Sequence, residues 1–168
     1  MRYTHEQLVQ HYNKQAAKRV GGMVLLFSPD GQLLITKPAY KTGWSLVGGT
    51  VDEGESPLVA ASREVGEEVG LALSVERFVF YGMRYAHPQK TLKDFIQIFF
   101  AVHLSADEVK LIKPHEREIS EYKFVSIDQL KQYADHPRMQ AVVALLADTA
   151  PSYMENEKVI SSALDSAS

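Results

Sequence analysis

The chain has 168 residues, of which 45% are hydrophobic and 23% are charged, and its formal net charge is −3. This size and composition are typical of one globular domain, and the weak charge gives no sign of a nucleic-acid or membrane surface. The chain contains no cysteine, which excludes a disulfide framework and thiol chemistry. Its longest purely apolar run, residues 141–147, is too short to span a bilayer, and residues 1–6 lack the apolar core of a signal peptide. We therefore expect a soluble, cytoplasmic protein without a DNA-binding surface.

The first predicted elements are a helix and a β-hairpin. Thr4 and Gln7 resemble a capping box, and the residues that follow predict a helix over residues 4–18. No chemistry is visible in this helix, so we expect it either to pack on the domain or to form the contact of a homodimer. Residues 19–27 and 32–37 are predicted strands, joined by a turn that contains Pro29 and Gly31.

A second helix is predicted over residues 56–69 and carries a dense group of acids. Ser56 and Pro57 form a strong helix start, and Gly70 suits its end. Its buried face is predicted from one narrow stripe at helical spacing: Leu58, Ala61, Ser62, Val65 and Val69.

The acids of this helix, Glu64, Glu67 and Glu68, are spaced i, i+3 and i+4, so their carboxylates are neighbours. Three acids near the negative end of a helix repel one another unless a cation lies among them. Clustered carboxylate oxygens are ligands for a hard cation, Mg²⁺ or Mn²⁺, which is usually shared with substrate phosphates. The alternative is a solvated acidic face, and the spacing of the surrounding residues decides between the two.

Five residues separate Gly49 from Glu55, and seven separate Glu55 from Arg63-Glu64-Val65. One residue then precedes Glu67-Glu68, and one more precedes Gly70-Leu71. This spacing resembles the signature of the Nudix hydrolase family at every fixed position. The signature covers 23 residues, and flanking features extend the resemblance over most of residues 20–148. One departure is Val47, which stands where the family usually has proline before its glycine pair.

The resemblance implies an α+β fold in which a mixed β-sheet is sandwiched between α-helices, with the hydrolase domain over residues 20–149. It implies Mg²⁺-dependent hydrolysis (Mn²⁺ is the other candidate) of the pyrophosphate link in a nucleoside diphosphate joined to another group. That substrate is a nucleotide sugar, ADP-ribose, a dinucleoside polyphosphate or a nucleoside triphosphate.

Two other hypotheses stay open. A Nudix-type sensor would bind a nucleotide without turning it over, although such proteins often lose signature acids that this chain retains. A different enzyme on the same fold, an isomerase or an mRNA decapping enzyme, is the third hypothesis. Nothing in the sequence resembles a decapping partner domain, and no catalytic cysteine is present.

The resemblance also implies roles for the signature residues. Glu64, Glu67 and Glu68 are the expected metal ligands, and the backbone carbonyl of Gly48 completes the shell. Glu55 and Arg63 hold the loop and the helix together and orient the ligands. The general base is either a helix Glu, such as Glu64 or Glu67, or one acid of the loop at 113–121, where Glu118 is favoured over Glu116 and Glu121.

The substrate contacts are predicted from residue type alone. Lys37, Lys41, Arg84 and Lys90 are candidates to meet phosphates, and Tyr40 and Tyr85 are candidates to stack on a base. Strands are predicted over residues 74–83 and 94–104, with a polar connection at 84–90 that suits a specificity loop. Pro88 and Tyr85 lie near positions that mark different substrate classes in the family, and neither fits well enough to choose a substrate.

The C-terminal part is predicted to contain a short strand at 122–125 and helices at 126–133 and 137–147. Residues 150–168 are polar and are interpreted as a tail that adds little to the core.

Overall fold

The computed structural model describes residues 3–87, 94–148 and 151–162. Pro88 and Lys90, which the sequence marked as candidates for specificity, lie outside these residues. The helices, including two short 3₁₀ helices η1 and η2, are α1 (His5–Asn13), α2 (Pro57–Val69), η1 (Val75–Arg77), α3 (Ala106–Leu111), α4 (Ile127–Leu130), η2 (Lys131–Tyr133) and α5 (Pro137–Leu146). The strands are β1 (Arg19–Phe27), β2 (Leu33–Pro38), β3 (Val47–Thr50), β4 (Val79–Ala86), β5 (Phe95–His103), β6 (Ile119–Val125), β7 (Ser152–Glu155) and β8 (Lys158–Ser162).

The strands form one mixed sheet in the order β6-β2-β1-β5-β4-β7-β8. β1 runs parallel to β5, and β4 runs parallel to β7, while the other pairs are antiparallel. The edge of β1 away from β5 is divided between two partners: residues 21–24 pair with β3, and Phe27 pairs with Leu33 of β2. The predicted hairpin of β1 and β2 is confirmed, and β3 joins the sheet with its glycine pair beside the middle of β1.

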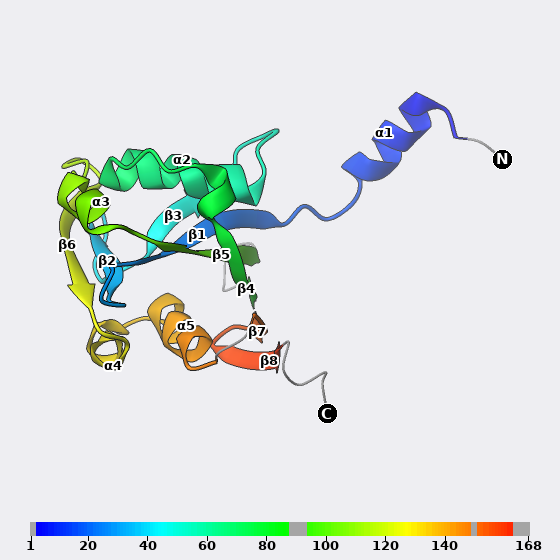
Figure 1. The fold of residues 1–168 in the computed structure, drawn as a ribbon. Helices are drawn as coiled ribbons and strands as arrows, with labels where there is room; N and C mark the ends of the chain where they lie inside the picture. Colours follow the sequence, from blue (N-terminus) through cyan, green and yellow to red (C-terminus); the bar gives the residue numbers. More distant parts are fainter. Residues whose placement is uncertain (1–2, 88–93, 149–150, 163–168) are drawn as a thin grey trace.

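Two helices cover opposite faces of the sheet (Figure 1). Because successive side chains of a strand point to opposite faces, Met23 and Leu25 of β1 lie in the core under α5, and Val24 and Leu26 lie in the core under α2. The apolar run of β1 is thus buried on both sides. The predicted mixed sheet between helices is confirmed.

Gly22 sets how closely α2 approaches the sheet. A Cβ atom at this position would lie 2.3 Å from the carbonyl oxygen of Pro57 and 2.9 Å from the amide nitrogen of Ala61. The first turns of α2 therefore rest directly on the backbone of β1.

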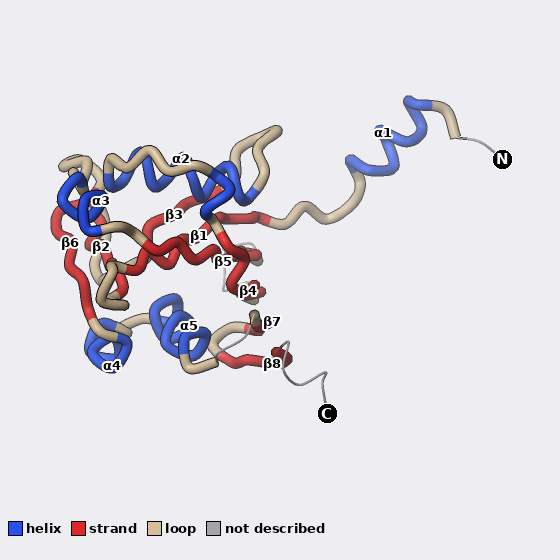
Figure 2. Tube along the Cα trace, viewed as in Figure 1, coloured by secondary structure: helices blue, strands red, loops and turns tan. Residues whose placement is uncertain are grey.

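The N-terminal helix is shorter than predicted and does not pack on the domain. It ends at Asn13, has no buried residue, and stands apart from the sheet beyond a stretch of loop (Figure 2). The predicted capping box between Thr4 and Gln7 is present. Since its apolar residues meet no core, the expectation that it packs on the domain is wrong, and the homodimer contact stays a prediction.

The interpretation of residues 150–168 as a tail that adds little to the core is also wrong. β7 pairs with β4 along residues 82–85, and β8 pairs back onto β7. Met154 is fully buried in the core under α5. The physical reason is that pairing with a neighbouring strand, rather than local hydrophobic content, stabilises this segment.

Two other boundaries differ from the prediction. β4 starts later, after the 3₁₀ helix η1, and continues through Ala86, so part of the expected specificity loop is strand. None of the helices that the structure describes has the length and apolar character needed to cross a bilayer.

Candidate active site

Helix α2 forms as its sequence predicts and presents its acids to β3. The Ser56 hydroxyl accepts a hydrogen bond from the Val59 amide at 3.2 Å, and Gly70 ends the helix with a φ of 74°. The buried residues of this helix are Ala60, Ala61, Val65 and Val69, while Leu58 is half-buried against the same core and Ser62 donates to the Leu73 carbonyl. The opposite face carries the acids.

Arg63 uses all five of its N–H donors. Its Nε and Nη2 donate to the two carboxylate oxygens of Glu55 at 3.0 and 3.1 Å, and Nη2 also reaches the Thr50 carbonyl at 3.1 Å. Its Nη1 donates to Glu64 at 3.0 Å and to Glu67 at 2.9 Å. The hydrogen bonds from Arg63 hold the pKa of Glu55 below its usual value, and Glu55 in turn raises the pKa of Arg63. Arg63 thus connects the loop after β3 to two of the three helix acids.

Glu64 and Glu68 lie against the glycine pair of β3. A Cβ atom at Gly49 would lie 2.0 Å from Oε1 of Glu64, so the carboxylate occupies the space that any larger residue would need. Glu68 accepts a hydrogen bond from the Gly48 amide at 3.2 Å. Both predicted ligands are therefore placed next to Gly48 and Gly49 by the packing of α2 on the sheet.

The surrounding positive charge is too small to offset the burial and mutual repulsion of the Glu64 and Glu68 carboxylates. Burial raises the pKa of Glu68 to about 8; the Gly48 amide opposes this, and the charges of Glu64 and Glu118 add to it. Burial also raises the pKa of Glu64, against the effect of Arg63. Lys41 acts in the opposite direction on Glu68. A cation among these oxygens would relieve both the burial and the mutual repulsion.

The acids are not, however, arranged around one point. In the part of the chain that the structure describes, no three acidic or histidine side chains converge closely enough to hold an ion as they stand. Glu67 is 52% exposed and is drawn toward Arg63. The donor set of hard carboxylate oxygens beside a glycine backbone fits, by its chemistry, a divalent cation such as Mg²⁺.

Of the three loop acids considered from sequence, Glu118 has the strongest electrostatic effect on the helix acids. Its charge is among the main influences that raise the pKa values of Glu64 and Glu68, and the charges of Glu116 and Glu121 are not. Backbone hydrogen bonds fix its loop to the end of α2, from Lys113 to the Val69 carbonyl at 2.9 Å and from His115 to the Glu68 carbonyl at 3.1 Å. Glu121, by contrast, pairs with Lys123 at 3.1 Å.

A cavity of about 450 Å³ lies where β1, β4 and β5 approach the start of α5. Of the five predicted substrate contacts that lie among the described residues, Lys41 and Arg84 line it. Tyr40 does not line the cavity. Desolvation and the charges of Glu68 and Glu64 raise its pKa, while the charge of Arg138, which lines the cavity, lowers it.

The remaining two substrate predictions are not supported by the geometry. Lys37 lies 3.9 Å from Glu121 across β2 and β6, and the Tyr85 hydroxyl donates to Asp94 at 2.7 Å. Tyr85 follows Arg84 along β4, and because neighbours in a strand point to opposite faces, the two do not line the same cavity. Sequence reasoning missed Arg19, Phe95 and Arg138, which line the cavity from three separate elements.

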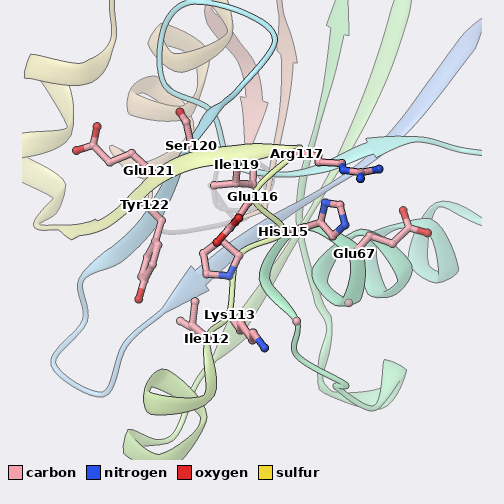
Figure 3. A pocket seen from close by; sticks show the side chains of 13 residues that line it. Glu67, Ile112, Lys113, His115, Glu116, Arg117, Ile119, Ser120, Glu121 and Tyr122 are labelled. Carbon is pink, nitrogen blue, oxygen red and sulfur yellow. The ribbon is translucent and has the colours of Figure 1, made fainter.

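A second cavity, of about 740 Å³, borders the exposed side of Glu67 (Figure 3). Glu67 of α2 borders it, together with the loop that precedes β6 and the first residues of that strand. His115, Glu116 and Arg117 are exposed there. Glu67 is therefore open to solvent on this side, which is consistent with a carboxylate that can change its orientation.

A mixed sheet between helices, with the acids of one helix set against a glycine pair, is the arrangement that the signature in the sequence implied. Residues 17–146 match the NUDIX domain. The chain belongs to the Nudix hydrolase family, whose members generally use a divalent metal ion.

Among curated proteins, the chain is similar to enzymes named RNA pyrophosphohydrolase. It is 31% identical to that of Bartonella henselae over 101 residues, which are 52% of this chain and 58% of the relative. It is 30% identical to that of Campylobacter jejuni strain RM1221 over 111 residues, which are 61% of this chain and 70% of the relative. A shorter match to that of Gluconobacter oxydans is 47% identical over 49 residues, 28% of this chain and 29% of the relative. The chain thus spans less than two thirds of the Gluconobacter and Bartonella relatives.

Solved structures resemble it more completely. The NUDIX domain of Shewanella oneidensis NrtR, complexed with ADP ribose, aligns with a TM-score of 0.67 at 14% identity, over 86% of this chain and 97% of that domain. An Ap4A hydrolase from C. elegans aligns with a TM-score of 0.62 at 17% identity, over 77% of this chain and 95% of that protein. At these identities the likeness shows the fold alone.

Proposed function

We propose that this protein is a Mg²⁺-dependent hydrolase of the pyrophosphate link in a nucleoside diphosphate joined to another group. The observation that carries the proposal is the placement of Glu64 and Glu68, two partly buried acids held against Gly48 and Gly49 with Glu118 nearby. Arg63 pairs with Glu64, whereas Glu68 makes no ion pair in the described chain, and a structural role alone gives no reason to bury such an acid beside a second one.

In this proposal Glu64, Glu67 and Glu68, with the backbone of Gly48, hold the metal. When bound, the metal neutralises phosphate oxygens and lowers the pKa of the attacking water. Mn²⁺ would serve the same oxygen ligands.

The chain's own residues supply position and proton transfer. Arg63, fixed by Glu55, keeps Glu64 and Glu67 on the side of the helix that faces the substrate, a supporting role that commonly affects metal sites about 10- to 100-fold. Glu118 is the candidate general base, because its loop is hydrogen-bonded to the end of α2 and its charge acts on the cluster. Lys41, which lines the cavity, would contact the substrate phosphates, and the neighbouring Tyr40 would stack on the base.

The identity of the substrate follows from the comparisons only as a set of candidates. Relatives named RNA pyrophosphohydrolase favour an RNA that carries a pyrophosphate link. A neighbour complexed with ADP ribose and a neighbour named Ap4A hydrolase favour nucleotide-linked diphosphates and dinucleoside polyphosphates. The alternative function is a nucleotide sensor without turnover.

The test is a substrate panel with Mg²⁺, in which the release of phosphate or nucleotide is measured for each candidate. Glu68→Gln keeps the size of the side chain and removes a negative ligand, so kcat should fall at least about 100-fold. Glu53→Gln is the matched control, since Glu53 is an exposed acid in the loop before α2. Turnover of Glu68→Gln equal to that of Glu53→Gln would contradict the metal role. Binding of a nucleotide without any turnover by the wild-type protein would favour the sensor.

A further inference from the structure

The 450 Å³ cavity collects positive charge beyond what its own acids balance. Four basic side chains line it from four separate segments: Arg19, Lys41, Arg84 and Arg138. Among the described lining residues, Asp135 is the single carboxylate. Cationic side chains from separate elements that face one hollow are the arrangement expected of an anion-binding site.

Arg138 gives the clearest indication of a missing anion. It is half-buried, and burial lowers its pKa. In the part of the chain that the structure describes, its guanidinium has no hydrogen bond and no ion pair. It is also the second residue of α5, a helix without a side-chain cap, so its charge lies at the positive end of the helix dipole. A partly buried cation in this position is unfavourable unless an anion binds beside it.

Arg84 lines the same cavity and is only 6% exposed. Its Nη1 donates to Gln97 at 2.6 Å, its Nε donates to the Asn156 carbonyl at 2.6 Å, and its Nη2 donates to Glu157 at 3.3 Å. A guanidinium has five N–H donors, so two remain after these three bonds. Gln97, which is fully buried beside Arg84, has a side-chain nitrogen without a partner.

The β7–β8 hairpin supplies two of the three groups that hold Arg84. Its turn residue Asn156 has a φ of 51°, and this conformation directs the carbonyl to the Nε of Arg84. The side-chain oxygen of Asn156 also accepts a hydrogen bond from the backbone amide of His87 at 3.0 Å. The backbone amide of Asn156 donates to the Tyr85 carbonyl at 2.9 Å. The hairpin lies after residue 146, where the match to the NUDIX domain ends.

We propose that the cavity binds a phosphate group through Arg84 and Arg138, and that the C-terminal hairpin positions Arg84 for this contact. The inference rests on the proposed function only in taking that phosphate to be part of the hydrolysed substrate. Lys41 connects the two places, since it lines the cavity and its charge also acts on Glu68. The hairpin is then a specificity element, which selects substrates that carry a phosphate beyond the metal-bound oxygens.

The test is calorimetric titration of the full chain in EDTA with pyrophosphate, ADP and adenosine, because binding without metal separates the cavity from the carboxylate cluster. Pyrophosphate and ADP should bind, and adenosine should bind at least about 10-fold more weakly, since phosphate recognition is the basis of affinity. If pyrophosphate binds with the same affinity as ADP, the site recognises phosphate alone. If ADP binds with higher affinity, the site recognises the phosphate of a nucleotide. Adenosine binding equal to ADP, or no binding of pyrophosphate and ADP, would overturn the proposal.

Variants assign the residues. Arg84→Met and Arg138→Met should each weaken ADP binding at least about 10-fold, while Lys110→Met, an exposed control on α3, should not. Arg138→Met keeps the test informative if Arg84→Met fails to fold, because no hydrogen bond in the described chain depends on that guanidinium. Unchanged affinity in a folded Arg138→Met protein would refute its role.

The hairpin is tested at Asn156, where glycine accepts a positive φ and valine does not. Asn156→Gly should keep the affinity, and Asn156→Val should lower it together with a raised KM and little change in kcat. Equal affinities of these two variants would refute the positioning role. If ADP binds in EDTA through Arg84 but no substrate is hydrolysed with metal, the cavity stands and the proposed hydrolase function fails. If a substrate is hydrolysed with metal but pyrophosphate and ADP do not bind in EDTA, the hydrolase function stands and the cavity proposal fails.

Discussion

Replacement of Arg63 by lysine tests whether the hydrogen bonds of this arginine hold the site together. Arg63 makes five hydrogen bonds, and a lysine ammonium has three donors on one nitrogen, so at least two bonds are lost. The paired bonds to Glu55 are among them, because one ammonium cannot reproduce a planar fork. Hydrogen bonds to charged groups contribute about 1.5–3 kcal/mol each. The Arg63 side chain is 27% exposed, so solvent screening reduces these contributions. We expect the free energy of unfolding of Arg63→Lys to fall by about 2 kcal/mol.

Urea unfolding measures that loss, and turnover with Mg²⁺ measures its effect on the acids, for which we expect a fall of about 10- to 100-fold. Arg77→Lys is a matched control, since Arg77 pairs with Glu108 and donates to the His103 carbonyl at 2.8 Å, away from the acids. Because Arg77 makes three hydrogen bonds rather than five, this variant should lose less stability, and it should retain activity. Equal activity in the two lysine variants, or unchanged stability of Arg63→Lys, would refute the reasoning.

Two further predictions concern stability. Gly66 is exposed within α2, and an added Cβ would meet only the Leu71 carbonyl, at 3.9 Å; Gly66→Ala should therefore raise the free energy of unfolding by about 0.5–1 kcal/mol, and a lower thermal midpoint would contradict this. Hydrogen bonds from Arg77 lower the pKa of Glu108 from 4.5 to about 2. The Arg77–Glu108 pair therefore stabilises the fold fully at pH values above 4.5, the pKa of Glu108 in the unfolded chain. This stabilisation is lost as the pH falls from 4.5 toward 2. After discounting for exposure we expect a loss of about 1 kcal/mol between pH ~6 and pH ~3, measured by urea unfolding. Arg77→Met should remove this part of the pH dependence, and an unchanged slope would assign it to other acids.

The helix that carries the acids could be predicted from sequence because its signals are local. Ser56, Pro57 and Gly70 mark its ends, and the 3.6-residue period separates its apolar stripe from Glu64, Glu67 and Glu68. The cavity depends on residues far apart in the chain, so no local pattern brings Arg19, Arg84 and Arg138 together. Arg138 carried no signal except its unusual place at a helix start.

The two segments that were misinterpreted fail for opposite reasons. Residues 4–18 have helical spacing, but helical spacing does not say that a partner surface exists, and α1 finds none in the described chain. Residues 152–162 are mostly polar, yet strands this short gain their stability from hydrogen bonds to a neighbour, which composition does not reveal. That Lys37 and Tyr85 lie away from the cavity could not be predicted for a similar reason, because the face of a strand residue is known only when the strand's extent is known.

The pairing of β7 with β4 also bears on how the domain is delimited. A chain that stopped where the family match stops would turn β4 from an interior strand into an edge strand, with its backbone groups unpaired. Val79 and Phe80 at the start of this strand are already exposed, and removal of Met154 would open the core under α5. Exposed edges of this kind pair with other chains. The family boundary would therefore be a poor place to cut this protein, and a shortened form would tend to aggregate.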